Sequence, residues 1–197
     1  MARIRQFLAE LDARWKPVGA EPFTLQIIGS AALMLQCDYD RGTKDGDILE
    51  SKDLSPAVKS QLLFLAEKGS GLHKELRIHV DIVRSAILFL PQKPEFHPVP
   101  DLRLKNFSIE ALDPVDVALS KLQRFSQSDR NDIRALADRG RLDQKRLLAR
   151  FEAAIDMFST DARADEFPLY IKNLHFVERE ILGVEPSPVE LPDWMQG

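Results

Sequence analysis

Cysteines and long apolar runs are the features that this sequence most clearly lacks. Cys37 is the only cysteine, which excludes a disulfide framework within the chain and a zinc site built from several cysteines. No apolar run approaches the roughly 20 residues that cross a bilayer. Charged residues interrupt the N-terminal segment, where a signal peptide would have its apolar core. We therefore expect a cytoplasmic protein that makes no membrane contact.

Several catalytic patterns are missing as well. The histidines, at positions 73, 79, 97 and 175, show no paired metal-ligand spacing. The sequence also has no Gly-rich phosphate loop, no dinucleotide motif and no recognisable serine or cysteine nucleophile arrangement. A net charge of −4 argues against a protein that coats nucleic acid through bulk electrostatics. His79 alone is a secondary site candidate, because it lies two residues before Asp81 and shares a strand face with it.

The order of predicted elements indicates an α+β fold with a small mixed β-sheet and flanking helices. Strands and helices alternate at first, and helices alone follow from Asp113. We expect an α/β core over 1–110 and a helical subdomain with an extended C-terminal tail over 111–197. Apolar periodicity predicts strands over 24–28, 45–50, 76–84, 86–90 and 102–107. It predicts helices over 3–15, 30–36, 55–67, 114–126, 129–138, 143–158 and 167–182.

Two aspartates separated by one residue form the main candidate site. Strand side chains alternate between faces, so Asp45 and Asp47 project from one side while Gly46 points away. Two carboxylates this close repel each other unless a cation lies between them, and hard divalent cations such as Mg²⁺ take oxygen ligands. A third acid, Asp81, lies in an apolar stretch that reads as another strand. Its neighbours predict a carboxylate shielded from solvent, which is costly without a partner.

A small-residue turn precedes these acids. Gly29 and Ser30 follow the mostly apolar run 25–28, and the Ala-rich segment after them is typical of a helix. The N-terminus of a helix presents unbonded N–H groups and favours anions. We therefore expect nucleotide phosphates to rest on Gly29 and Ser30, beside a metal site suited to phosphoryl or nucleotidyl transfer.

This order of motifs resembles the nucleotidyltransferase superfamily related to DNA polymerase β. The superfamily pattern joins a hydrophobic residue, Gly and Gly or Ser to an Asp-x-Asp pair and a later third acid on a strand. Here it reads Ile28-Gly29-Ser30, Asp45-Gly46-Asp47 and Asp81. The variant with Arg41, Thr43, Asp45 and Asp47 at alternate positions looks like the branch that contains AbiEii-type toxins. Residues 113–122 and 129–133 are similar to the helical part of that branch.

The resemblance implies a metal-dependent enzyme that moves an NMP from an NTP to a hydroxyl acceptor, either an RNA end or a protein. It implies Mg²⁺, with Mn²⁺ as the alternative, and a cognate antitoxin if the protein is a toxin. The catalytic and metal-binding residues it implies are Asp45, Asp47 and Asp81. The nucleotide-binding residues it implies are Gly29, Ser30, Arg41, Thr43 and Lys121.

A non-enzymatic alternative stays open. The residue between the paired aspartates is usually apolar in this superfamily because it anchors the strand, whereas Gly46 packs nothing. This departure favours a catalytically weak or inactive nucleotidyltransferase-fold protein that acts as a nucleotide-binding or regulatory module. The retention of all three acids favours the enzyme.

The helical half also permits two interpretations of its charges. Residues 121–150 contain nine Lys or Arg against four Asp or Glu, which is typical of a solvated helical face or of a surface that holds RNA. Lys121 is either a cation that reaches a triphosphate or a lysine at the rim of the core. Asp129 and Asp132 are either helix-capping acids or site residues.

Overall fold

The computed structural model describes residues 3–17, 23–37, 39, 45–51, 54–158 and 162–189. The chain forms two compact units. The first contains residues 1–87 and 96–112, and the second contains 88–95 and 113–197. The chain therefore passes between the units three times, and the segment 88–95, which we call the strap, belongs with the helices.

The first unit is built on a five-stranded mixed sheet with the strand order β3-β2-β1-β5-β4. Strands β1 and β5 are parallel, as are β2 and β3, whereas β1/β2 and β4/β5 are antiparallel. The strands span Phe23–Ile27 (β1), Asp45–Leu49 (β2), His79–Val83 (β3), Phe96–Pro98 (β4) and Phe107–Leu112 (β5). The parallel pairing of β2 with β3 sets two acidic strands side by side.

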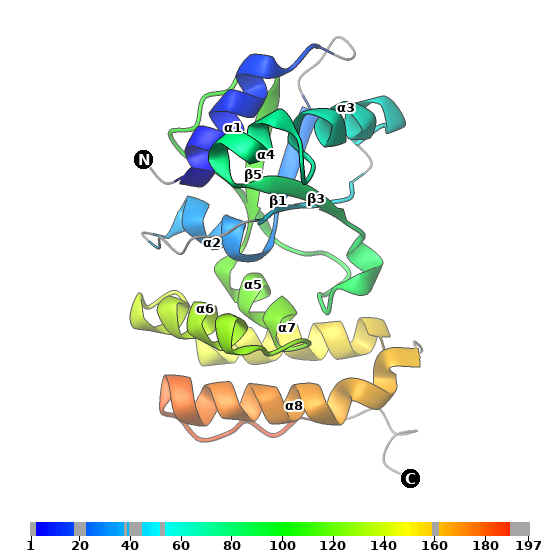
Figure 1. Ribbon diagram of the computed structural model, residues 1–197. Helices are drawn as coiled ribbons and strands as arrows, with labels where there is room; N and C mark the ends of the chain where they lie inside the picture. The colour runs from blue at the N-terminus through cyan, green and yellow to red at the C-terminus, as the bar shows by residue number, and fades with distance from the viewer. Residues whose placement is uncertain are drawn as a thin grey trace. The chain divides into compact units, whose positions relative to one another are not determined.

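Four helices cover this sheet. They span Arg3–Arg14 (α1), Gly29–Gln36 (α2), Pro56–Ala66 (α3) and Gly71–Leu76 (α4), and a short 3₁₀ turn, η1, spans Ser85–Ile87. Helix α1 contacts α2, α3 and α4, and Figure 1 shows α1, α3 and α4 grouped beside the strands. Helix α1 buries Ile4, Phe7 and Leu11 completely, because these residues recur at helical spacing on the face toward the sheet.

The second unit is helical. Its helices span Pro114–Lys121 (α5), Gln127–Asp138 (α6), Gln144–Phe158 (α7) and Phe167–Phe176 (α8), with a 3₁₀ helix at Ala162–Glu166 (η2) and a π-helix at Val177–Leu182 (η3). Helix α5 packs against both α6 and α7. Asp113 caps α5 by accepting a hydrogen bond from Val115 N, and Pro114 occupies the first turn, where its missing N–H is tolerated.

The strap docks on the helices through one aromatic residue and a set of ion pairs. Phe89 contacts the ring of Tyr170, with centroids 4.8 Å apart, and the ring of Phe151 at 5.3 Å. At the end of the strap, Glu95 N donates to Asp116 Oδ2 and Glu95 O accepts from Asp113 N. Arg150 donates two hydrogen bonds to the carboxylate of the buried Asp116 and a third to Lys93 O. Arg146 pairs with both Glu95 and Asp113.

The α+β prediction, with a small mixed sheet, flanking helices and a helical C-terminal part, is confirmed. Two local predictions are wrong, and one helix was missed. The expected strand over 102–107 is displaced to β5, which lies inside the sheet between β1 and β4. The expected strand over 86–90 is a 3₁₀ turn followed by the strap, and α4 was not predicted at all. None of the described helices has the length and apolar composition needed to cross a membrane.

Candidate functional site

The Gly29–Ser30 turn and Asp47 meet in the first unit. Ile28 N donates to Asp47 O at 2.9 Å, so the end of β1 is tied to the middle of β2. Gly29 has a φ of 61°, in the left-handed region, and a Cβ built on it would lie 2.9 Å from Asp47 Oδ2. A side chain at position 29 would therefore displace the Asp47 carboxylate, and glycine is the residue that tolerates both the φ value and the close approach.

Strand β3 adds the third predicted acid. Asp81 is the register partner of Asp47, and His79 is the register partner of Asp45, across the parallel β2–β3 ladder. Register partners in a parallel pair share a face of the sheet, so Asp47 and Asp81 lie on the same face. The structure thus brings together Gly29, Asp47 and Asp81. The Asp45 side chain, and both Arg41 and Thr43, lie outside what the structure describes.

The environment of Asp81 differs from the one expected. Its side chain is 58% exposed, because its apolar neighbour Val80 points to the opposite, buried face. The prediction of a shielded carboxylate is therefore wrong, since alternation along the strand separates Asp81 from the residues beside it in the sequence. His79 Nε2 lies 3.2 Å from Asp81 Oδ2, so the expectation that the two share a strand face is confirmed.

Gly46, the departure from the superfamily pattern, faces the core beneath α1. A Cβ at this position would lie 3.7 Å from Ile4 Cδ1, 3.9 Å from Ile78 Cγ2 and 3.5 Å from His79 O, all ordinary contacts. Ile4 is fully buried there. The apolar side chain that usually anchors this strand is therefore replaced by one from the N-terminal helix, and the strand does not lack packing.

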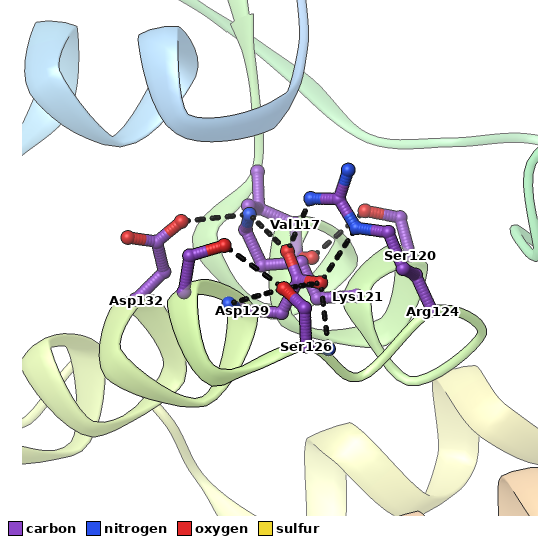
Figure 2. A network of polar contacts seen from close by, with 8 residues as sticks. Val117, Ser120, Lys121, Arg124, Ser126, Asp129 and Asp132 are labelled. Atoms are coloured by element: carbon purple, nitrogen blue, oxygen red, sulfur yellow. Dashed lines mark hydrogen bonds and ion pairs between the residues drawn. The ribbon is translucent and has the colours of Figure 1, made fainter.

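The predicted cation Lys121 lies in the second unit, at the end of α5. It is 6% exposed, and its Nζ lies 2.7 Å from Asp132 Oδ2 and 3.2 Å from Asp129 Oδ1. Figure 2 shows these groups converging between α5 and α6. The rim position weighed from the sequence is wrong, because the ammonium is buried and its charge is matched by two acids.

Asp129 is the centre of this cluster. Ser126 and Asp129 form a capping box at the start of α6, and Arg124 donates two hydrogen bonds of 2.8 Å to the Asp129 carboxylate (Figure 2). Burial alone would raise the pKa of Asp129, but the hydrogen bonds from Arg124 and Ser126 and the charge of Lys121 outweigh it. They hold the pKa well below its usual range. The capping interpretation of Asp129 is confirmed.

The sequence gives no signal for Arg124, and α6 begins two residues before the predicted start at 129. The signal that identifies the cap is Ser126-x-x-Asp129. The Ser126 hydroxyl accepts a hydrogen bond from Asp129 N, and the Asp129 carboxylate accepts one from Ser126 N. The apolar periodicity predicts a helix that starts at Ser128 and Asp129. The hydroxyl of Ser128 instead lies 2.9 Å from that of Ser126.

Four of the nine basic residues in 121–150 form ion pairs with described residues of the second unit. Lys121 and Arg124 pair with aspartates of the same segment, whereas Arg146 and Arg150 pair with acids outside it. The local excess of basic residues therefore does not by itself make a basic surface.

The described donors fit a hard divalent cation. Asp47 and Asp81 supply carboxylate oxygens on neighbouring strands, and the absent Cβ of Gly29 keeps space open beside one of them. Comparison with curated proteins finds no match, and comparison with solved structures finds none either. A family model described as "nucleotidyltransferase of unknown function (DUF6036)" matches residues 3–179, and the chain therefore belongs to that family.

Proposed function

We propose that the protein is a metal-dependent nucleotidyltransferase that moves an NMP from an NTP to a hydroxyl acceptor. The observation that carries the proposal is the position of the Asp47 carboxylate, which lies where a Cβ at position 29 would collide with it and is in register with Asp81. Asp45, Asp47 and Asp81 would hold Mg²⁺, with Mn²⁺ as the alternative ion, and the bound metal would supply Lewis-acid stabilisation of the charge that develops during an in-line displacement.

The transfer forms one bond and breaks one bond. The acceptor oxygen attacks the α-phosphorus, the bond from that phosphorus to the bridging oxygen of the β-phosphate breaks, and pyrophosphate leaves. Asp81 takes the acceptor proton in this proposal, and its exposure to solvent supports that role. His79 orients Asp81 through their contact of 3.2 Å.

Four further groups bind the nucleotide in this proposal. The turn of Gly29 and Ser30 receives phosphate oxygens at the N-terminus of α2, whose cap residue Ile28 offers no side-chain acceptor for the first turn. Arg41 and Thr43 contact the phosphates from the segment before β2. Lys121 neutralises phosphate charge.

The membership in a nucleotidyltransferase family supports the proposal at the level of reaction class. The spacing of Arg41, Thr43, Asp45 and Asp47 supports the finer assignment to the AbiEii-like branch, with an RNA end or a protein as acceptor. On that assignment the protein is the toxin of a toxin–antitoxin pair, and its partner is a cognate antitoxin.

Calorimetry with ATP and CTP, with and without Mg²⁺, tests the proposal. The parent protein should bind one of them only when Mg²⁺ is present. Asp47→Asn should abolish that binding and stay folded, because the substitution removes a charged ligand and relieves repulsion. The exposed Asp138→Asn is the matched control and should bind like the parent. Binding by Asp47→Asn equal to that of the parent contradicts the assignment. Binding without any transfer to RNA or protein favours the regulatory alternative.

A further inference from the structure

The turn between α5 and α6 presents an aromatic residue in an unfavourable backbone conformation. Phe125 has a φ of 46°, and its N–H donates to Lys121 O at 2.9 Å, so it closes the end of α5 as a left-handed cap. Glycine is the usual residue at such a cap, because a β-carbon is strained there. A bulky aromatic residue rarely adopts a left-handed backbone conformation, and such unfavourable conformations concentrate at functional positions.

The Phe125 ring forms one side of a small stacked cluster. It contacts the ring of Phe176 of α8 at 5.5 Å, and the guanidinium of Arg130 lies 5.5 Å from the Phe125 centroid and 5.9 Å from that of Phe176. All three side chains are only half-buried. The cluster thus offers two partly open ring faces with a planar cation between them.

No acid among the described residues pairs with Arg130. Within the part of the chain that the structure describes, its polar contact is the neutral Gln127 Oε1, at 3.0 Å, and it forms no ion pair. Arg134, one helical turn further along α6, is exposed and likewise forms no ion pair with a described residue. These two cations differ from Lys121 and Arg146, whose charges are held by aspartates.

Partly open aromatic rings beside unmatched arginines are the chemistry that recognises single-stranded nucleic acid. Bases stack on the rings, and guanidinium groups contact phosphates or stack in turn. Gln127 and Asn131 lie beside Arg130 with exposed amide groups, which can bond the 2′-hydroxyl that DNA lacks. We propose that Phe125, Arg130 and Phe176 form a surface that binds a single-stranded RNA end. This inference rests on the proposed nucleotidyl transfer for its purpose, since the RNA would be the acceptor.

Fluorescence anisotropy with a labelled single-stranded RNA of about ten nucleotides tests this surface. Single-strand-binding domains that stack bases on aromatic rings cover roughly 4–16 nucleotides. The titration contains no NTP and no metal, so it does not depend on the chemistry. Phe125→Asn should weaken RNA binding about tenfold by removing a stacking ring. Asparagine tolerates the left-handed backbone, and circular dichroism verifies that the variant is folded.

Two substitutions of Arg130, to Gln and to Lys, test the surface independently of Phe125. Arg130→Gln should weaken binding and reduce the log–log salt slope by about 0.7, the value of one phosphate contact on a single strand. Arg130→Lys should restore the slope but not the full affinity, because lysine keeps the charge and loses the stacking plane. Arg141→Gln, which removes an exposed cation elsewhere, should bind RNA like the parent.

Parent-like RNA affinity in both Phe125→Asn and Arg130→Gln overturns the proposal, as does a parent protein that binds no RNA. Equal affinity for a DNA strand of the same sequence overturns the assignment to RNA. Asp47→Asn separates the two proposals. If it keeps NTP binding while Arg130→Gln loses RNA, the nucleotidyl-transfer site is wrong and this surface stands. If Asp47→Asn loses NTP binding while the surface variants still bind RNA, the RNA surface is wrong and the nucleotidyl-transfer site stands.

Discussion

Asp81 and Asp129 are both acids near proposed functional groups, yet the two units treat them differently. Asp81 in the sheet is 58% exposed, and its described contact is a histidine. Asp129 in the helical unit is 1% exposed, and its carboxylate is contacted by Lys121, Arg124 and Ser126. A carboxylate matched by several donors belongs to the scaffold, whereas one left open to solvent beside another acid can take a ligand. Exposure and the number of fixed partners thus distinguish the two roles together.

The largest expected effect is on activity, in the sheet unit. Asp81→Ala should lower turnover by about a thousandfold while it changes the NTP dissociation constant little, because Asp45 and Asp47 still hold the nucleotide-bound ion. Transfer of labelled NMP measures turnover, and calorimetry measures the dissociation constant. Because Asp81 is exposed, the free energy of unfolding should change by less than about 0.5 kcal/mol. Undiminished turnover would remove Asp81 from the mechanism.

The opposite pattern is expected in the helical unit. Asp129→Ala should lower the free energy of unfolding by about 3 kcal/mol, because it removes the cap of α6 and leaves Lys121 buried with one acid. Urea unfolding measures this loss, and the exposed Asp138→Ala on the same helix is the control. A loss as small as that of the control would show that the buried cluster contributes little, and the contrast between the units would fail.

The acid dependence of stability should follow from the same residue. The folded-state pKa of Asp129 is lowered, so its contribution is present above the unfolded pKa of about 3.9 and is lost as pH falls toward the folded value. The difference in unfolding free energy between the parent and Asp129→Asn should be constant above about pH 5. It should shrink below about pH 4, by up to about 1.4 kcal/mol per pH unit. A difference that stays constant through this range would contradict the assignment.

The smallest expected effect concerns Gly46. Gly46→Ala should change the free energy of unfolding by less than about 1 kcal/mol, because its Cβ makes only ordinary contacts. Gly46→Val should cost about 1–3 kcal/mol through overpacking against Ile4, and its cost should be smaller when it is introduced into the Ile4→Ala variant. Thermal unfolding compares the effect of Gly46→Val in the parent and in Ile4→Ala. Equal losses in Gly46→Val with and without Ile4→Ala would show that Ile4 does not fill this position.

The sequence predicts the parts of the fold that depend on local pattern. The strand before Gly29, the Asp-x-Asp strand and helix α1 follow from apolar periodicity and turn residues. Helix α4 was missed because its six residues, Gly71–Leu76, carry no amphipathic repeat, and its cap at Ser70 is the only local signal. The position of β5 depends on pairing with β1, a long-range choice that the run before Phe107 does not reveal.

The site shows the same division between local and long-range information. The register of Asp47 with Asp81 is consistent with the alternation in each strand, but the exposure of Asp81 depends on which face of the sheet the helices cover. The ion pairs of Lys121 depend on how α6 packs against α5, and no spacing in the sequence fixes that packing. Buried partners of a charged residue are therefore the least predictable part.

The strap has a consequence for the order in which the chain folds during synthesis. Phe89 leaves the ribosome well before Phe151 and Tyr170, the rings that receive it. The sheet, in turn, needs β5, which is made after the strap. The nascent chain must therefore carry an uncovered aromatic segment between β3 and β5 until α7 and α8 have been translated. A fragment made of residues 113–197 alone lacks this segment, and we expect it to fold only when a peptide with the sequence of residues 88–95 is supplied in trans.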